Sequence, residues 1–278
     1  MHESSAVTMT DPQSVPKASA NDPQMMQVGS GEAARNIAFI RAIPPAQSGQ
    51  PGLVWLPGFM SDMQSSKVTA LADWAQAQNR ALLRFDYSGH GLSQGRFADG
   101  NIGQWLEDSL AVIRAQSAGP QILVGSSMGA WLALLVARAL AALGETARLH
   151  AMVLIAPAVD FTERLMWARL SPEIRRQIET TGVWLRPSAY GAPYPITRQL
   201  IEEGRRHLLL GAALRSFCPV QILQGMQDPD VPWQHAMTLV EHLAADPVAI
   251  TLVKDGDHRL ARPQDIARML AAIAAISA

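Results

Sequence analysis

The stretch Gln121–Leu143, QILVGSSMGAWLALLVARALAAL, decides the fold of this chain. Its first four residues form an apolar run typical of a buried strand, and Met128–Leu143 is an apolar segment of helical length. Between them, Gly125-Ser126-Ser127-Met128-Gly129 matches the pattern G-x-S-x-G, in which a strand turns directly into a helix. The two glycines relieve the crowding at such a turn, so the hydroxyl of Ser127 projects at the N-terminus of the helix.

This position makes Ser127 the candidate nucleophile of an enzyme. The amide of Met128, at the start of the helix, points toward an oxyanion formed on an attacked carbonyl group. A structural alternative is that Ser126 and Ser127 only cap the helix. The strand before the motif and the helix after it favour the catalytic interpretation.

Strands and helices alternate on both sides of this stretch. Such alternation predicts an α/β fold in which a mainly parallel sheet is covered by helices on both faces. The expected strands are Asn36–Ile43, Leu53–Leu56, Ala81–Asp86, Gln121–Val124, His150–Ile155, Val220–Leu223 and Val248–Val253. The expected helices are Val68–Gln78, Trp105–Gln116, Met128–Leu143, Trp233–Leu243 and Pro263–Ile276.

Two regions depart from the alternation. Residues 1–30 are rich in Ser, Pro, Gln and Asn and show no period, which predicts a disordered tail. They match neither a secretory signal nor a mitochondrial transit peptide, so we expect a cytoplasmic protein. Asp160–Phe217 shows no convincing strand and several prolines, which indicates a lid of short helices over the active edge. Residues 31–278 therefore form one domain, with the lid at about 160–217.

Composition excludes several classes of protein. Hydrophobic residues make up 48% of the 278 residues and charged residues 17%, so the chain is neither mainly disordered nor a coiled coil. The net charge of −1 provides no overall positive potential that would attract nucleic acid. Cys218 is the single cysteine, which excludes an internal disulfide and a multi-cysteine zinc site. No apolar run reaches the roughly 18 residues that a membrane span needs. Only three of the 23 basic residues are lysines, a bias typical of a GC-rich bacterial genome.

A serine nucleophile needs a base, and the base needs a carboxylate to hold it. Downstream of Ser127 the candidates for the base are His207, His235, His242 and His258. Two of them lie within an expected helix, and His207 lies in the lid beside two arginines. His258 follows the expected strand Val248–Val253 directly, at the edge of the sheet where Ser127 is expected. We therefore predict that His258 is the base.

The candidate acid is Asp228, which follows the expected strand Val220–Leu223. In hydrolases with a strand–turn–helix nucleophile the chain order is serine, acid, histidine, and Asp228 fits that order. Asp230 is the alternative, although it could instead cap the following helix. Asp257 is a less suitable acid because it is next to His258 in the chain, and the side chains of adjacent loop residues rarely form a hydrogen bond with each other.

A second oxyanion donor is expected in the loop after Leu53–Leu56. Gly58 lets the backbone approach the oxyanion, and the amide of Phe59 is the natural donor. The alternative for Phe59 is that it simply covers the core. His90 precedes Ser127 in the chain, which breaks the expected order, so we interpret it as a structural histidine that anchors its own loop.

Aromatic residues divide into two groups. Trp55, Trp105 and Trp131 lie in expected strands and helices and belong to the core. The lid carries candidates for substrate binding, because a lid covers an apolar cavity; these are Trp184, Tyr190 and Tyr194.

Together these residues resemble the serine α/β-hydrolase superfamily. Within it, the chain is similar to the subgroup of abhydrolase-domain acyl-protein thioesterases and acyl-glucuronide esterases from mitochondria and to their bacterial relatives. The resemblance runs from about residue 50 to 275 and rests on motifs that occur together: Leu56-Pro57-Gly58-Phe59, Phe85-Asp86-Tyr87-Ser88-Gly89-His90-Gly91, Val124-Gly125-Ser126-Ser127-Met128-Gly129, Gln224-Gly225-Met226-Gln227-Asp228, Val231-Pro232-Trp233 and Asp257-His258-Arg259. The lid departs from the subgroup at Gly191–Pro195, so the acyl or leaving-group preference need not carry over.

The resemblance and the residues imply a serine esterase or thioesterase acting on a small-molecule ester or acyl thioester. Neither a metal nor an organic cofactor is implied, no nucleic acid or membrane span is expected, and the sequence indicates no oligomeric state. A C–C bond hydrolase or a perhydrolase would use the same three residues. A catalytically silent hydrolase fold that binds a ligand or partner is the alternative from a different class. Dehalogenases and epoxide hydrolases of this fold are disfavoured, because they attack with a carboxylate where Ser127 stands.

Overall fold

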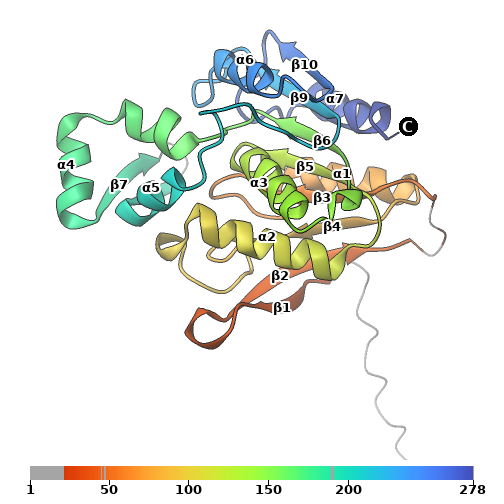
Figure 1. Ribbon diagram of the computed structural model, residues 1–278, viewed down its shortest axis with the longest axis horizontal. Coiled ribbons are helices and arrows are strands. Elements are labelled where there is room, and N and C mark those ends of the chain that lie inside the picture. The colour runs from red at the N-terminus through yellow and green to blue at the C-terminus, as the bar shows by residue number, and fades with distance from the viewer. Residues whose placement is uncertain (1–21, 45, 47, 189–190, 278) are drawn as a thin grey trace, which may run out of the picture.

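The computed structural model describes residues 22–44, 46, 48–188 and 191–277. Its main sheet has eight strands in the order β1-β2-β4-β3-β5-β6-β9-β10 (Figure 1). They are β1 Gln24–Val28, β2 Arg35–Ala42, β3 Gly52–Leu56, β4 Leu82–Phe85, β5 Gln121–Ser126, β6 Leu149–Ile155, β9 Val220–Gly225 and β10 Val248–Val253. β2 is antiparallel to both of its neighbours, and every other pairing in the sheet is parallel. The predicted α/β fold with a mainly parallel sheet is confirmed.

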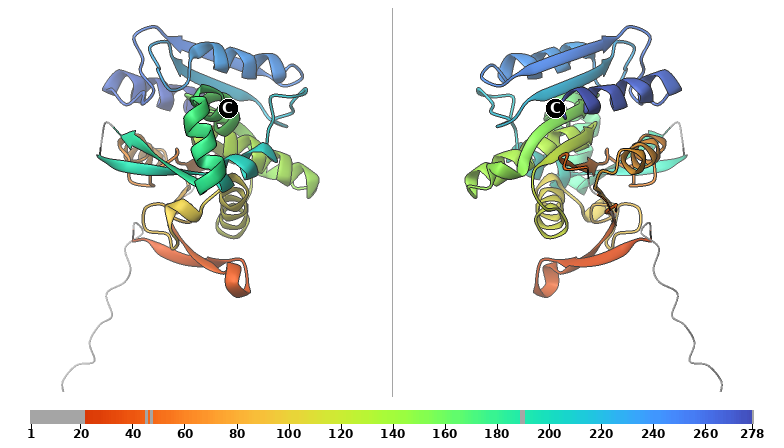
Figure 2. Two further views of the ribbon diagram at one scale, coloured as in Figure 1. Left: turned by 90° about the vertical axis from the view of Figure 1, so that its left-hand side faces the viewer. Right: turned by 90° about the vertical axis from the view of Figure 1, so that its right-hand side faces the viewer.

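Helices cover both faces of this sheet (Figure 2). Strand side chains alternate between the faces, so Val54 and Leu56 join one buried cluster while Leu53 and Trp55 join the other. The first cluster includes residues of α2 (Ile102–Gln116), α3 (Met128–Ala142) and α6 (Trp233–His242). The second includes residues of α1 (Ser66–Ala77) and α7 (Pro263–Ala275). Short helical turns lie between these elements: η1 Gly31–Ala33, η2 Phe97–Asp99 and η3 Thr146–Arg148.

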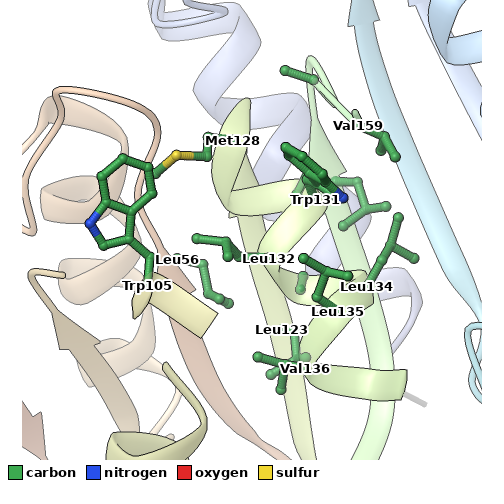
Figure 3. Close-up of a cluster of buried hydrophobic side chains, with 14 of the residues drawn as sticks. Leu56, Trp105, Leu123, Met128, Trp131, Leu132, Leu134, Leu135, Val136 and Val159 are labelled. Atoms are coloured by element: carbon green, nitrogen blue, oxygen red, sulfur yellow. The ribbon is translucent and has the colours of Figure 1, made fainter. Parts of the chain in front are cut away.

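The helix that follows the decisive turn, α3, is buried on almost every side. Figure 3 shows its side chains packed against Leu123 of β5, Leu56 of β3 and Trp105 of α2. Trp55, Trp105 and Trp131 expose at most 1% of their surface, which confirms their predicted place in the core. Burial of a tryptophan removes about 150–250 Å² from water, which is about 4–6 kcal/mol of transfer free energy. The core therefore fixes the start of α3.

The predicted disordered tail is wrong for its last part. Gln24–Val28 form β1, an edge strand that pairs antiparallel with β2, and Val28 is buried. The three apolar residues in this short segment gain a partner because β2 lies beside them after the loop that contains η1, a contact that composition does not show. Residues 1–21 lie outside the described part of the chain.

The segment between β6 and β9 projects beyond the strand ends, on the left of Figure 1. It contains η4 (Thr162–Met166), η5 (Trp167–Arg169), α4 (Pro172–Thr181), β7 (Val183–Ser188), β8 (Gly191–Thr197) and α5 (Arg198–Arg205). The prediction of helices alone is wrong here, since β7 and β8 pair as an antiparallel hairpin. Pro187, Pro193 and Pro195 lie in this hairpin and are tolerated because each of its strands has one open edge, where no amide is needed. Pro172 is the first residue of α4, a position that suits proline.

Parallel strands bring their carboxyl ends to one edge of the sheet. The loops that follow β3, β4, β5, β6, β9 and β10 therefore meet there, and the segment Asp160–Phe217 departs from the same edge. This edge is where open α/β sheets bind ligands.

Candidate active site

Ser127 occupies a sharp turn between β5 and α3. Its backbone has φ 54° and ψ −116°, outside the regions that an L-residue prefers. Hydrogen bonds hold the turn on both sides: the amide of Ser127 donates to the carbonyl of Ile155 at 2.8 Å, and its carbonyl accepts from Ala130 at 3.0 Å. A strained residue of this kind costs on the order of 1–3 kcal/mol and persists where the surroundings enforce it.

The two glycines of the motif permit this close packing. A Cβ at Gly125 would lie 2.5 Å from the carbonyl oxygen of Gly129. A Cβ at Gly129 would lie 2.0 Å from the carbonyl oxygen of Leu56, at the end of β3. The turn therefore packs directly on the neighbouring strand, and the glycine spacing in the sequence follows from that contact.

His258 lies beside Ser127, on the loop after β10. Its Nε2 is 3.1 Å from the Oγ of Ser127, and its Nδ1 is 2.7 Å from Oδ2 of Asp228. Because a carboxylate only accepts hydrogen bonds, the Nδ1 carries the proton and the Nε2 is free to accept from the serine hydroxyl. The structure thus brings the three predicted residues together in the predicted order.

Asp228 is buried and fully used as an acceptor. Its Oδ1 accepts from the amides of Asp230 at 2.9 Å and Val231 at 2.8 Å. Its Oδ2 accepts from His258 and, at 3.3 Å, from the side-chain amide of Gln224. This set of donors holds the carboxylate in place, with Oδ2 facing the imidazole.

The two predicted oxyanion donors lie on either side of the turn. The loop after β3 approaches it closely, since a Cβ at Gly58 would be 3.3 Å from the Ser126 carbonyl and 3.4 Å from the Cβ of Ser127. Among the backbone hydrogen bonds of the described turns and loops, none uses the amide of Phe59 or Met128 as a donor. Both amides are therefore available to an added acceptor.

Comparison with known proteins gives the family. Residues 53–199 match the family model described as serine aminopeptidase, S33. A putative hydrolase from Agrobacterium vitis S4 has 46% sequence identity and a TM-score of 0.88, over 92% of this chain and 99% of that structure. The chain belongs to the serine α/β-hydrolase superfamily.

Relatives with a stated activity narrow the comparison within this superfamily. The mouse protein named palmitoyl-protein thioesterase ABHD10, mitochondrial, is 36% identical over 225 residues, which are 80% of this chain and 74% of that protein. Its human counterpart is 35% identical over 218 residues, which are 78% and 69%. The structure of the mouse protein has a TM-score of 0.78 and 33% identity, over 91% of this chain and 98% of that structure. The subgroup that the sequence resembles is thereby confirmed, and the chain is a hydrolase.

The lid of this hydrolase meets the loop after β3 through aromatic rings. The ring of Phe59 is 6.1 Å from Tyr194 of β8 and 5.4 Å from Phe161, centroid to centroid. Arg186 of β7 lies over Tyr194 at 5.9 Å. Of the three predicted substrate-binding residues, Tyr194 therefore lies next to Phe59 in the loop after β3. Trp184 is half-buried and packs against the main core, and Tyr190 lies outside the described residues.

One lid residue that the sequence did not single out touches the acid loop. Arg169 donates to the carbonyl of Asp230 at 3.1 Å and lies 3.5 Å from that of Pro229. An arginine in an arginine-rich lid gives no local signal for such a contact. The lid is thus attached close to Asp228.

The other histidines have partners elsewhere. His207 pairs with Glu203 at 3.1 Å, and His242 bonds the Thr238 carbonyl of its own helix at 2.8 Å. His235 bonds the Val159 carbonyl at 2.8 Å, and burial lowers its pKa. Each of these rings therefore has a partner other than Ser127.

One group of side chains has a spacing that suits a metal ion. Asp228, Asp230 and His258 hold one ligand atom each within 4.8 Å of one another, the only such group in the described part of the chain. The Asp228 oxygens already accept four hydrogen bonds, one of them from His258. These contacts account for the position of the carboxylate without an ion.

A hollow of about 180 Å³ adjoins the loop after β3, between Met60–Asp62, Gly89–Gly91 and Phe97. A larger one of about 330 Å³ lies away from Ser127, lined mainly by residues 208–217. We assign substrate to neither by size alone, since the reacting carbonyl must lie within reach of Ser127. In residues 22–277, apart from the gaps given above, no helix has the length and apolarity to cross a bilayer.

Proposed function

We propose that this protein cleaves carboxylic esters or thioesters through an acyl-enzyme on Ser127. The observation that carries the proposal is the continuous line of hydrogen-bond contacts from Ser127 through His258 to Asp228, at 3.1 and 2.7 Å. A serine hydroxyl that faces a neutral imidazole nitrogen, with a buried carboxylate on the other nitrogen, is the arrangement that activates serine for acyl transfer.

In the proposed acylation, the Oγ of Ser127 attacks the acyl carbonyl while Nε2 of His258 takes its proton. Asp228 stabilises the imidazolium that forms, and the amides of Phe59 and Met128 donate to the oxyanion. Collapse of the tetrahedral intermediate breaks the bond to the leaving alkoxide or thiolate, which receives the proton from His258. An alcohol or a thiol leaves, and the acyl group remains on Ser127.

Deacylation repeats the sequence with water. His258 removes a proton from water as it attacks the acyl-enzyme, and then returns that proton to the Oγ of Ser127. The carboxylic acid departs and the free enzyme is restored. Each proton is held by His258 for part of the cycle, so the ring must stay oriented by Asp228 throughout.

The names of the mouse and human relatives support the thioester branch of the proposal. The rings around Phe59 support an apolar acyl group, since the half-buried Tyr194 presents aromatic surface beside the proposed oxyanion donor. We place the acyl chain along this surface and propose Trp184, Tyr190 and Tyr194 as residues that set its length. A cytoplasmic site of action remains our proposal.

The test combines labelling with a substrate panel. A fluorophosphonate should form an adduct on Ser127, located by peptide mass spectrometry, and should abolish hydrolysis of esters and thioesters of graded acyl length. Ser127→Ala is the blank, and Ser126→Ala is the matched control that should keep its activity. An adduct on Ser126, or folded protein that neither reacts nor turns over any substrate, would overturn the mechanism and favour a binding function.

A further inference from the structure

The loop after β4 holds the loop after β3 at three successive points. The hydroxyl of Tyr87 donates to the Pro57 carbonyl at 3.0 Å. The amide of Met60 donates to Nε2 of His90 at 3.3 Å. A third contact joins Asp86 Oδ1 to the amide of Met63 at 2.7 Å. Phe59, whose amide is the proposed oxyanion donor, lies inside the stretch that these contacts fix.

The backbone at Met60 shows why a restraint is needed there. Its φ is +57°, a left-handed conformation that a residue with a long side chain rarely adopts. Met60 is also half-exposed, at 52% of its surface, so burial of its own side chain does little to enforce the conformation. The contact from His90 to the Met60 amide acts on this strained residue, directly after the Phe59 peptide.

The protonation of His90 suits this contact. The Nε2 accepts from a backbone amide, so the proton lies on Nδ1, which donates to the Ser88 carbonyl at 3.3 Å. The ring is buried and in contact with the rings of Tyr87, Phe97 and Trp105. Burial lowers its pKa to about 4, which keeps the acceptor nitrogen free at neutral pH.

The loop that carries these groups is itself anchored. Buried Asp108 on α2 accepts from the amide of Ser88 at 2.9 Å and from its hydroxyl at 2.7 Å, and it pairs with Arg35 of β2 at 2.7 Å. The indole of Trp105 donates to the Ser88 carbonyl at 3.0 Å. The contacts to the β3 loop therefore start from a rigid support.

We infer that Asp86, Tyr87 and His90 position the Phe59 amide for the oxyanion, and that His90 is the main positioning residue among them. This inference rests on the proposed function, because it assigns a role to the β3 loop in that reaction. It also changes the interpretation of His90, whose ring acts on a neighbouring loop and not only on its own.

The experiment compares His90→Phe with His90→Gln. Phenylalanine keeps a ring among the aromatic residues but offers no acceptor, whereas the side-chain oxygen of glutamine can accept from Met60. Loss of a whole oxyanion donor costs about 10²–10³ in kcat, so a displaced donor should cost about 10- to 100-fold in His90→Phe. We expect KM to change less than about threefold, and His90→Gln to recover most of the loss.

A trifluoromethyl ketone gives a second readout, because its adduct with serine carries an oxyanion. Its affinity should fall in parallel with kcat/KM in His90→Phe. His242→Gln, in a ring bonded within α6, is the matched control and should behave as wild type. If His90→Phe does not fold, Tyr87→Phe replaces it in the test, because this change removes only the hydroxyl that donates to Pro57. Tyr87→Phe should lower kcat about three- to tenfold.

Two results would overturn the inference while leaving the proposed function intact. One is a kcat within about twofold of wild type in both His90→Phe and Tyr87→Phe. The other is an equal loss in His90→Phe and His90→Gln with unchanged affinity for the ketone, which would show that the acceptor is irrelevant. Turnover that survives Ser127→Ala would instead overturn the proposed function itself.

Discussion

Replacement of Asp228 by asparagine should disable the base through a specific rearrangement of hydrogen bonds. Two backbone amides, of Asp230 and Val231, donate to the Oδ1 position at 2.9 and 2.8 Å. The asparagine oxygen must take that position, because an NH₂ group there would face two donors. The NH₂ group then faces Nδ1 of His258, which must become the acceptor. The proton moves to Nε2, the nitrogen that has to accept from Ser127.

The size of the effect follows from this wrong tautomer. A histidine with its proton on the nitrogen facing the nucleophile cannot act as a base until it is rearranged at a cost. In a well-studied serine protease the same change lowers kcat by about 10⁴, which is about 5.5 kcal/mol of transition-state free energy. We expect a loss of that order here, since the buried carboxylate makes equivalent contacts. The fold should persist, because the substitution keeps the shape and both contacts to the backbone amides.

The assay is single-substrate turnover of a short activated ester, with Tm measured on the same samples. Imidazole ¹⁵N chemical shifts should show the Nε2–H tautomer of His258 in Asp228→Asn and the Nδ1–H tautomer in wild type. Asp230→Asn is the matched control, one turn of the loop away and exposed. A loss below tenfold in Asp228→Asn, or an unchanged tautomer, would refute the reasoning; a larger loss in Asp230→Asn would move the acid to that residue.

Four further outcomes are expected. Burial lowers the pKa of His90 to about 4, so below pH 6.5 the unfolded chain binds a proton at this residue that the folded chain does not bind. The free energy of unfolding should therefore fall by about 3 kcal/mol between pH 6.5 and 4. The urea midpoint should fall less over this pH range in His90→Gln than in wild type. Gly129→Ala should cost about 3 kcal/mol or more by the same assay, because its Cβ would overlap a backbone carbonyl of β3. Trp184→Ala should change discrimination between long and short acyl esters by about 1–3 kcal/mol and leave the shortest ester near the wild-type rate; equal losses would show that the lid shapes the catalytic geometry. Removal of residues 1–30 should lower Tm relative to removal of residues 1–21, since only the longer deletion takes away β1; equal Tm values would show that β1 adds no stability.

The fold and the spatial grouping of Ser127, Asp228 and His258 could be predicted because their signals are local. The two glycines around Ser127 form a motif that can be recognised locally, although Gly129 packs against the Leu56 carbonyl of β3. Asp228 and His258 each follow an apolar strand directly, and parallel strands deliver such residues to one edge whatever the order of the strands. These predictions required no knowledge of which distant segments of the chain contact one another.

The positions that sequence reasoning missed depend on which elements become neighbours. The contact between His90 and Met60 joins loops 30 residues apart, and it exists because β3 and β4 lie side by side in the sheet. Strand β1 is similar: it is a short amphipathic segment that becomes a strand only because β2 has a free edge. The β7–β8 hairpin was not predicted because its prolines were interpreted as helix breaks. Proline is equally compatible with an edge strand.

The order of the strands also has a consequence in time. Asp228 and His258, the proposed acid and base, come 101 and 131 residues after Ser127 in the chain. During synthesis at about 5–20 residues per second, the base is therefore made roughly 7–26 s after the serine. A nascent chain that has already folded β3, β5 and α3 carries a serine hydroxyl with no imidazole beside it. Under the proposed mechanism, hydrolysis requires β9 and β10, because Asp228 and His258 follow these strands. A nascent chain that lacks them is therefore expected not to cleave esters.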